Sequence, residues 1–237
     1  MPCKASIALL GALLVTTLPA PAPSQTGKLP PAAQQPPPEP APRPMPEGYT
    51  RLPAQEAEAI REVIRGYAAA VQRSDGLAAA QAVTRGTRAY YARMRDLALT
   101  ASETKTRGLP LMDRFSVLMY RHRVSPQVLR AISGDSAFAH TISEGWVAQT
   151  MGSGPIPTMG EVWGGGNRAL IRDGATDIHL QREDGAWRWD MMPLIRIMSE
   201  QFAANLPGGM KEAEFIFYVL TYSNGQPVSS TIWQPAQ

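Results

Sequence analysis

Cysteine is almost absent from this chain of 237 residues, which contains a single copy, Cys3. Cys3 lies ahead of the apolar run that opens the sequence, so cleavage after that run would leave a mature protein without cysteine. Such a protein forms no disulfide, no thiolate nucleophile and no cysteine-based metal site. We therefore expect an apolar core, rather than covalent cross-links, to stabilise the folded part.

A strong excess of one charge is also lacking. The chain has 23 Lys and Arg against 20 Asp and Glu, which gives a formal net charge of +3. Nucleic-acid binding needs basic residues clustered on one face, so we expect no nucleic-acid partner. Histidine is scarce too: His140 and Glu144 are four residues apart, but no third ligand has a suitable spacing. We therefore predict neither a metal site nor a cofactor.

Two motifs that would identify an enzyme class are missing. Gly164-Gly165-Gly166 precedes a predicted strand, whereas a phosphate-binding loop opens a helix and continues with Lys and Ser or Thr. A bend or bulge in the chain is the better interpretation of this glycine run. Gly134-Asp135-Ser136 lacks the Gly-x-Ser-x-Gly form of a serine nucleophile elbow.

The longest apolar run, Ala5 to Leu18, has 14 residues, fewer than the ~20 that a membrane-spanning helix needs. Lys4 precedes this run and small residues follow it as far as Ser24, which is the layout of a cleavable signal peptide. We predict that residues 1–24 are removed and that the protein is exported, to the periplasm or outside the cell, with no membrane span afterwards. An uncleaved membrane anchor is the alternative.

Proline is concentrated between Lys28 and Pro46, where nine of the nineteen residues are proline. Proline fixes φ and removes a backbone donor, so neither a helix nor a sheet propagates through such a stretch. We predict a proline-rich disordered linker over 25–48 that acts as a semi-rigid spacer, followed by one folded domain over 49–237. A docking peptide for a proline-binding groove is the alternative.

Helical periodicity dominates the first half of this domain. Apolar residues recur at the i, i+3, i+4 and i+7 positions of amphipathic helices. The predicted helices run from Pro53 to Gly76, over Thr87–Leu99, onwards from Pro110, and from Ser125-Pro126 to Ile132. The segment Ser136–Trp146 fits a helix or a strand, and we predict a helix. Two further helices are predicted near the carboxy terminus, over 194–206 and 213–220.

Two Asp-Gly pairs, at Asp173-Gly174 and Asp184-Gly185, predict tight hairpin turns. They divide a three-stranded antiparallel meander into Asn167–Arg172, Ala175–Glu183 and Ala186–Met192. The register set by two-residue turns aligns Ala169, Ile178 and Met191 on an apolar core face, with Leu180 beside Trp189. The opposite face then carries Arg168, His179 and Asp190 in one row. Val228 to Trp233 is predicted to add an edge strand.

The order of elements, helices followed by a meander, resembles the NTF2-like (SnoaL-like) superfamily. The resemblance includes a tryptophan-rich strand at the end of the meander, in the segment DIHLQREDGAWRWDMMPL. The resemblance covers 54–74 and 167–194, and the helices between and after these parts depart from it. It implies an α+β cone in which amino-terminal helices pack on an antiparallel β-meander, here with two further carboxy-terminal helices. The superfamily includes isomerases, dehydratases, ligand binders and scaffolds, so the fold does not identify the function.

His179 and Asp190 are predicted to be direct cross-strand neighbours, and a carboxylate that holds an imidazole is the core of a general base. Arg168 on the next strand would bind an anion beside them. A polar sheet face in contact with water is the alternative interpretation. Tyr67, Tyr90 and Trp189 would line a pocket for an apolar ligand, or else pack in the core.

Two functions from different classes follow from these patterns. The first is an exported, non-catalytic binding or interaction domain on a proline-rich spacer, whose partner is a small apolar ligand or an envelope protein. A homodimer is compatible with this interpretation. The second is a small-molecule enzyme, isomerase- or dehydratase-like, that uses His179 and Asp190 as a general-base pair.

Overall fold

The computed structural model describes residues 44–134, 136–146, 160–173, 176–204, 206 and 209–236. The predicted signal peptide and most of the predicted linker lie outside these residues. The described part is a mixed α+β structure with an antiparallel sheet, as the sequence predicts. Within it, no helix combines the length and the apolar character needed to cross a membrane.

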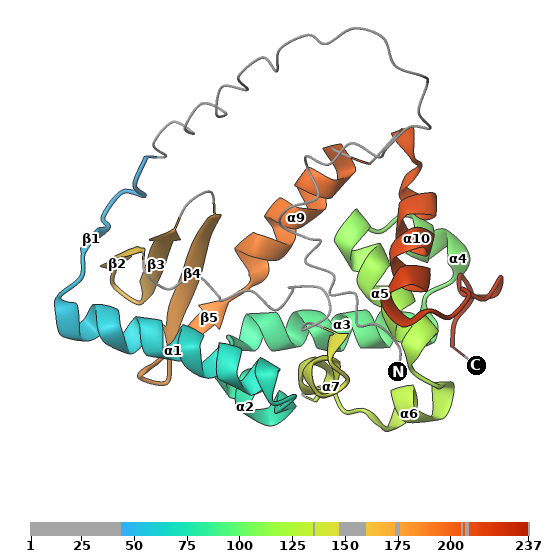
Figure 1. Cartoon of the computed structure of the whole chain (residues 1–237), viewed down its shortest axis with the longest axis horizontal. Coiled ribbons are helices and arrows are strands. Elements are labelled where there is room, and N and C mark those ends of the chain that lie inside the picture. Colours follow the sequence, from blue (N-terminus) through green and yellow to red (C-terminus); the bar gives the residue numbers. More distant parts are fainter. Residues whose placement is uncertain are drawn as a thin grey trace, which may run out of the picture.

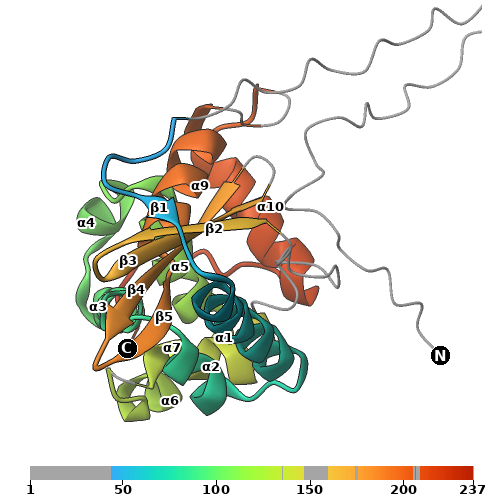
Figure 2. The ribbon, with the colours of Figure 1, turned by 90° about the vertical axis from the view of Figure 1, so that its left-hand side faces the viewer.

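A five-stranded sheet lies at one end of the molecule (Figure 1). Its strands follow the chain in the order β1-β2-β3-β4-β5, and every neighbouring pair is antiparallel (Figure 2). The strands are β1 (Thr50–Arg51), β2 (Glu161–Gly165), β3 (Arg168–Asp173), β4 (Thr176–Glu183) and β5 (Ala186–Asp190). The meander therefore has two more strands than the sequence predicts.

Helices separate β1 from the rest of the sheet. They are α1 (Ala54–Gln72), α2 (Gly76–Ala82), α3 (Arg85–Thr100), α4 (Glu103–Arg107), α5 (Leu111–Arg123), α6 (Pro126–Ala131) and α7 (Ala137–Ser143). The structure confirms the predicted helices, including the helical interpretation of Ser136–Trp146. It also confirms the cap at Ser125, whose hydroxyl accepts the Val128 N–H. The sequence analysis overlooked the short helices α2 and α4.

Gly76, predicted to end the first helix, instead begins α2. Asp75 is the N-cap of α2, and its carboxylate accepts the Ala78 N–H at 3.0 Å. The glycine is required because α2 packs directly on α7. A Cβ atom at Gly76 would lie 2.1 Å from the carbonyl oxygen of Ala139. The chain therefore turns sharply after α1, which brings two short helices into backbone contact.

The predicted register is right for one hairpin and wrong for the other. Glu183 pairs with Ala186 and Leu180 with Trp189, which confirms the β4–β5 register. In β3–β4, however, Arg172 pairs with Asp177 rather than with residue 175, so this register is shifted by two residues. The observed register places the Arg172 guanidinium 3.3 Å from the Asp177 carboxylate. This ion pair is one of the cross-strand contacts of the observed register, which also pairs Ala169 with Leu180.

The glycine run allows β1 to lie close to β2. Gly164 and Gly165 belong to β2, whereas Gly166 has φ +61° in the turn that follows. A Cβ atom on Gly164 would lie 2.9 Å from the Leu52 side chain, and one on Gly165 would lie 2.6 Å from the Gly48 carbonyl oxygen. The bend that the sequence predicts is therefore confined to Gly166, and the other two glycines admit the neighbouring chain.

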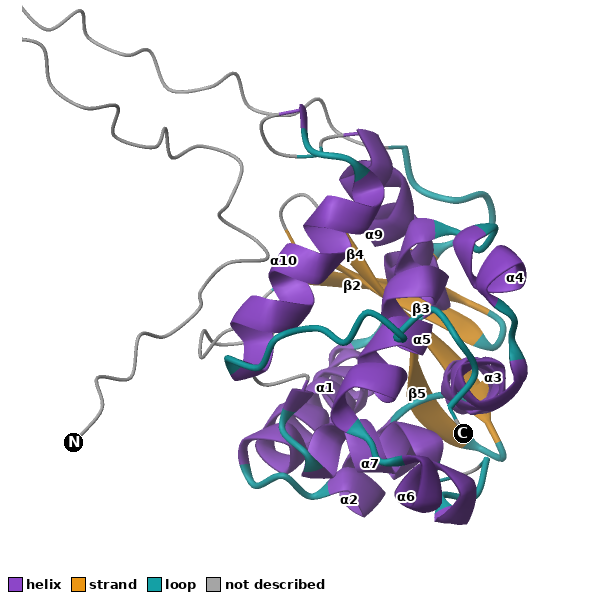
Figure 3. Cartoon of the chain, turned by 90° about the vertical axis from the view of Figure 1, so that its right-hand side faces the viewer, coloured by secondary structure: helices purple, strands orange, loops and turns teal. Residues whose placement is uncertain are grey.

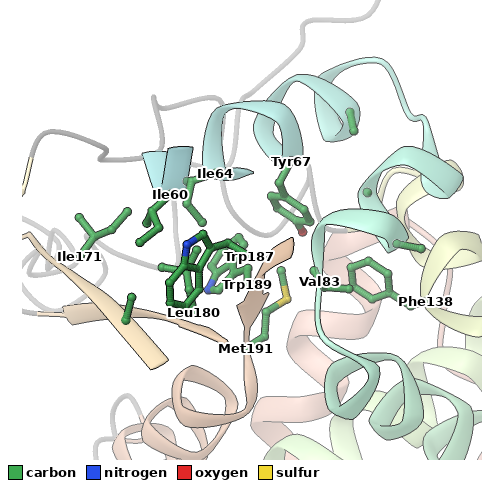
Figure 4. Close-up of a cluster of buried hydrophobic side chains, with 14 of the residues drawn as sticks. Ile60, Ile64, Tyr67, Val83, Phe138, Ile171, Leu180, Trp187, Trp189 and Met191 are labelled. Atoms are coloured by element: carbon green, nitrogen blue, oxygen red, sulfur yellow. The ribbon is translucent and has the colours of Figure 1, made fainter. Parts of the chain in front are cut away.

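One hydrophobic core, which we call the sheet core, lies between α1, α2, α7 and one face of the sheet. Figure 4 shows Ile60 and Ile64 of α1 over Leu180, Trp187 and Trp189 of the sheet. These side chains come from alternate positions of β4 and β5, so the apolar face is the one predicted from the register.

A second core, the helical core, joins α3, α5 and the carboxy-terminal part of the chain. The last two described helices are α9 (Met192–Ala204) and α10 (Glu212–Asn224), which confirms the two predicted carboxy-terminal helices. Helix α5 packs against α3, α9 and α10 (Figure 3). The predicted edge strand from Val228 to Trp233 is wrong, because 230–233 form turns. Ile232 and Trp233 are instead buried in the helical core.

Candidate functional site

The structure brings His179 and Asp190 together as predicted, as directly opposed residues of β4 and β5. Both are half-buried. The Asp190 carboxylate accepts the N–H of Met192 at 3.1 Å, at the start of α9. Asp190 therefore has a structural task, because a carboxylate that bonds the first N–H groups of a helix stabilises it. His179 and Asp190 therefore have the predicted cross-strand arrangement, but the Asp190 carboxylate already accepts a hydrogen bond at the start of α9.

Arg168 does not lie directly beside this pair. The shifted β3–β4 register places Arg168 opposite Gln181, and it places the buried Leu170 opposite His179. The cross-strand row on this face is therefore Trp163, Leu170, His179 and Asp190. An apolar side chain stands where the predicted anion-binding residue would be, so the row Arg168–His179–Asp190 is a wrong prediction.

Tyr67 and Trp189, which the sequence offered as pocket or core residues, both lie in the sheet core. Tyr67 is 0% and Trp189 3% exposed. Their ring centroids are 4.8 Å apart in an edge-to-face arrangement, the favoured contact of packed aromatic rings. Burial raises the pKa of the Tyr67 hydroxyl, which has no hydrogen-bond partner among the residues that the structure describes. These two residues pack against each other rather than line an open cavity.

Tyr90, the remaining predicted ligand residue, lines a cavity of about 320 Å³ between α3, α5 and α9, which we call the helical pocket. Its apolar wall consists of Tyr90, Pro110, Met192 and Ile195. Every residue of α9 keeps some exposed surface. Met192 and Ile195 therefore turn one side towards the cavity while they pack on the helical core.

Charged groups surround the mouth of the helical pocket. Arg93 of α3 forms an ion pair with Asp113 of α5, with a distance of 3.1 Å between Nη2 and Oδ2. The Arg93 guanidinium also lies 5.7 Å from the centre of the Tyr90 ring. Burial raises the pKa of the Tyr90 hydroxyl, so it stays neutral at physiological pH. Arg196 and Glu200 of α9, both exposed, complete the mouth.

A second cavity, of about 460 Å³, lies at the end of the sheet where β1 crosses β2. Arg168 lines it, together with Trp187 and the glycines of β2. Arg182 also borders it, with its guanidinium 4.5 Å from the centre of the Trp187 ring and 2.5 Å from the Glu56 carboxylate. The lining of this cavity is mainly polar. Neither His179 nor Asp190 lines either cavity.

Of the residues that line the helical pocket, only Tyr90 is among the predicted ligand-binding residues. The helix predicted over 194–206 corresponds to α9, but its contribution to the pocket is not predicted. The residues Met192, Ile195, Arg196, Ser199 and Glu200 follow the i, i+3, i+4, i+7, i+8 stripe of one helix face. The sequence shows this stripe, but it does not show which other helices lie opposite the stripe and form the cavity with it.

The described residues contain no group of three or more His, Cys, Asp or Glu arranged to hold a metal ion. His140 of α7 instead lies with its ring 5.8 Å from that of Trp146. Burial lowers the pKa of His140, an effect that the nearby Glu144 opposes. His140 is therefore mainly neutral at pH 7.

Comparison with known proteins adds no name to this site. No protein-family model matches the chain, and neither the curated proteins nor the solved structures contain a match. The resemblance to the NTF2-like superfamily therefore stays a prediction.

Proposed function

We propose that this protein is an exported, non-catalytic binding domain that holds a small, largely apolar ligand in the helical pocket. Its proline-rich segment serves as the spacer that carries the domain away from a membrane or an envelope partner. The resemblance to NTF2-like domains, which include ligand binders, supports this proposal without identifying the ligand. We also propose that the domain has the cone shape of that superfamily.

The observation that carries the proposal is the helical pocket itself. Its volume of about 320 Å³ falls at the lower end of the ~300–1,000 Å³ that is typical of ligand sites. The surface of its lining is mainly apolar, and Arg93, Asp113, Arg196, Ser199 and Glu200 add polar groups that could orient a small molecule.

The test uses Nile red, an uncharged dye that fluoresces in apolar surroundings. The change Ser199→Phe places a ring in the helical pocket, because Ser199 lines it. We expect the dye to bind the parent protein and to bind this variant at least about tenfold more weakly. Thr221→Phe, at an exposed position of α10, is the matched control that adds the same ring elsewhere. Equal dye binding by all three proteins would contradict the proposal.

The second candidate is a small-molecule enzyme that uses His179 and Asp190, and the confirmed cross-strand pairing of these residues favours it. An isomerase- or dehydratase-like reaction needs a general base within hydrogen-bond reach of the substrate proton. The bond from Met192 to Asp190 and the position of both cavities argue against this candidate. Binding of a ligand that perturbs the His179 ring signals in an NMR spectrum would favour it.

A further inference from the structure

The pocket-facing stripe of α9 changes character along its length. Met192 and Ile195, at the start of the helix, contribute apolar surface to the wall of the helical pocket. The same stripe continues with Arg196, directly after Ile195, and with Ser199 and Glu200 one turn further on. A ligand that lies along this stripe would therefore meet an apolar environment at one end and two opposite charges at the other.

Two of the four charged groups at the mouth neutralise each other. Arg93 and Asp113 form an ion pair, and the Asp113 side chain is only 13% exposed. Arg196 and Glu200 form no ion pair with any residue in the described part of the chain, and both are exposed. They are four residues apart with the cation first, which is the weaker order for pairing along a helix. Both charges are therefore available to a ligand.

The ligand that fits this pattern has an apolar side chain, a carboxylate and an ammonium group. We propose that the helical pocket binds a short apolar zwitterion, an amino acid or dipeptide, with its carboxylate at Arg196 and its ammonium group at Glu200. Arginine is well suited to the first task, because its planar guanidinium matches a carboxylate. This inference rests on the proposed function, since it assigns a ligand class to the same pocket.

The dimensions are compatible with such a ligand. Residues one turn apart on a helix are separated by ~5.4 Å along its axis, and the ends of an extended dipeptide are at most ~7 Å apart. The cavity of about 320 Å³ is small enough to suit an amino acid or a dipeptide rather than a lipid. A monocarboxylate would use Arg196 but would leave the Glu200 charge at the mouth unmatched.

Calorimetric titration of the full-length mature protein with leucyl-leucine tests the proposal. The comparison compounds are acetyl-leucyl-leucine, which keeps only the carboxylate, leucyl-leucine amide, which keeps only the amine, and the doubly capped peptide. A partly exposed charge pair contributes a factor of about five or less to affinity. We therefore expect each cap to weaken binding about threefold to fivefold, and the two caps to weaken it about tenfold or more.

Two charge variants assign the contacts. Arg196→Gln should weaken binding of leucyl-leucine and of the acid-only peptide, and should leave the amine-only peptide unaffected. Glu200→Gln should have the opposite selectivity. Arg73→Gln, which removes an exposed charge at the end of α1, is the matched control and should change no affinity. All three positions are exposed, so melting temperatures should confirm that each variant folds.

The outcomes separate this inference from the proposed function. Equal binding of free and capped peptides, with Nile red still excluded by Ser199→Phe, would overturn the zwitterion and keep the apolar pocket. Tightest binding of the acid-only peptide, unaffected by Glu200→Gln, would assign a monocarboxylate instead. A protein that binds neither the peptides nor the dye would overturn both the inference and the proposed function.

Discussion

Replacing Arg121 by Leu should lower the free energy of unfolding by ~2–4 kcal/mol, because several carbonyl oxygens lose a charged donor in a half-buried site, at ~1–3 kcal/mol for each acceptor that water does not reach. Arg121 lies near the end of α5 and is half-buried. Its guanidinium donates hydrogen bonds to six acceptors. They are the carbonyl oxygens of Leu97 (3.2 Å), Ala98 (2.9 Å), Ala101 (2.6 Å), Ile232 (3.3 Å) and Trp233 (2.8 Å), and the hydroxyl of Thr106 (3.3 Å).

None of these acceptors is a carboxylate, so the compensation for burying the charge comes from dipoles. Leu97 and Ala98 lie in the last turn of α3, whose carbonyl oxygens carry the negative end of the helix dipole and also accept the N–H groups of Ala101 and Ala236. Burial lowers the pKa of Arg121 to about 10, so the group is still a cation at neutral pH. One side chain thus holds the end of α3 and the carboxy-terminal segment in a single network.

The magnitude follows from what the substitution leaves behind. A hydrogen bond to a charged group contributes ~1.5–3 kcal/mol, but six bonds from one guanidinium are not additive. Water would reach some of the carbonyls released by Arg121→Leu, because the site is only half-buried. The loss should therefore stay well below the sum of six bonds. Arg121→Lys keeps the charge but loses the planar guanidinium with its several N–H donors, and should lower the free energy of unfolding by ~1–2 kcal/mol.

Urea unfolding followed by tryptophan fluorescence measures these differences, since Trp233 lies in the same network. The matched control is Arg130→Leu on α6, an exposed arginine whose guanidinium also reaches the carboxy-terminal segment, at 3.5 Å from the Ala236 carbonyl oxygen. Its cost should stay below ~0.5 kcal/mol, the usual limit for an exposed residue. A change of less than ~0.5 kcal/mol for Arg121→Leu would refute the reasoning.

Three further predictions concern other parts of the molecule. Trp189→Ala should lower the free energy of unfolding by ~3–5 kcal/mol as a core deletion. Asp190→Asn should cost less than ~1 kcal/mol, because the amide oxygen of Asn can accept the same Met192 N–H. Chemical denaturation compares the two variants, and equal costs would contradict the register. Gly76→Ala should destabilise the protein by ~1–3 kcal/mol, because its Cβ meets a backbone carbonyl. Gly66→Ala, with open space around it in α1, should stabilise the protein by ~0.5–1 kcal/mol. Shifts of the melting temperature in the same direction for both variants would contradict this prediction. Intact-mass measurement of the exported protein should show the loss of residues 1–24, and a product that keeps them would favour an anchor.

The β4–β5 hairpin could be predicted from the sequence because its turn dipeptide and the apolar pattern of its two strands indicate the same register. Asp184 has φ +51° and Gly185 φ +79°, as the Asp-Gly turn requires, and this turn aligns the two tryptophans with the apolar face. The β3–β4 hairpin has the same dipeptide but a register shifted by two residues, in which Arg172 pairs with Asp177. A turn dipeptide alone does not reveal which cross-strand pairs will compete with it.

The strands β1 and β2 could not be predicted because their signals are not local. Thr50–Arg51 is too short for a periodic pattern, and the glycines of β2 weaken any strand propensity. Their pairing depends on the close approach of Gly48 and Leu52, which lie more than a hundred residues away in the sequence. The helical pocket is similar, since the periodicity indicates the inward faces of α3 and α9 but not the distance between them.

The way in which β1 joins the sheet has a mechanical consequence. If the residues before it act as the predicted spacer, any tension on that spacer reaches the domain at β1. This strand is held by two residue pairs with β2 and by the bond from the Leu52 N–H to the Val162 carbonyl oxygen, at 3.1 Å. So short an edge strand would peel away under a pull while the sheet core stayed packed. The domain would thus yield at its edge first, and the pocket on the far helices would keep its shape under load.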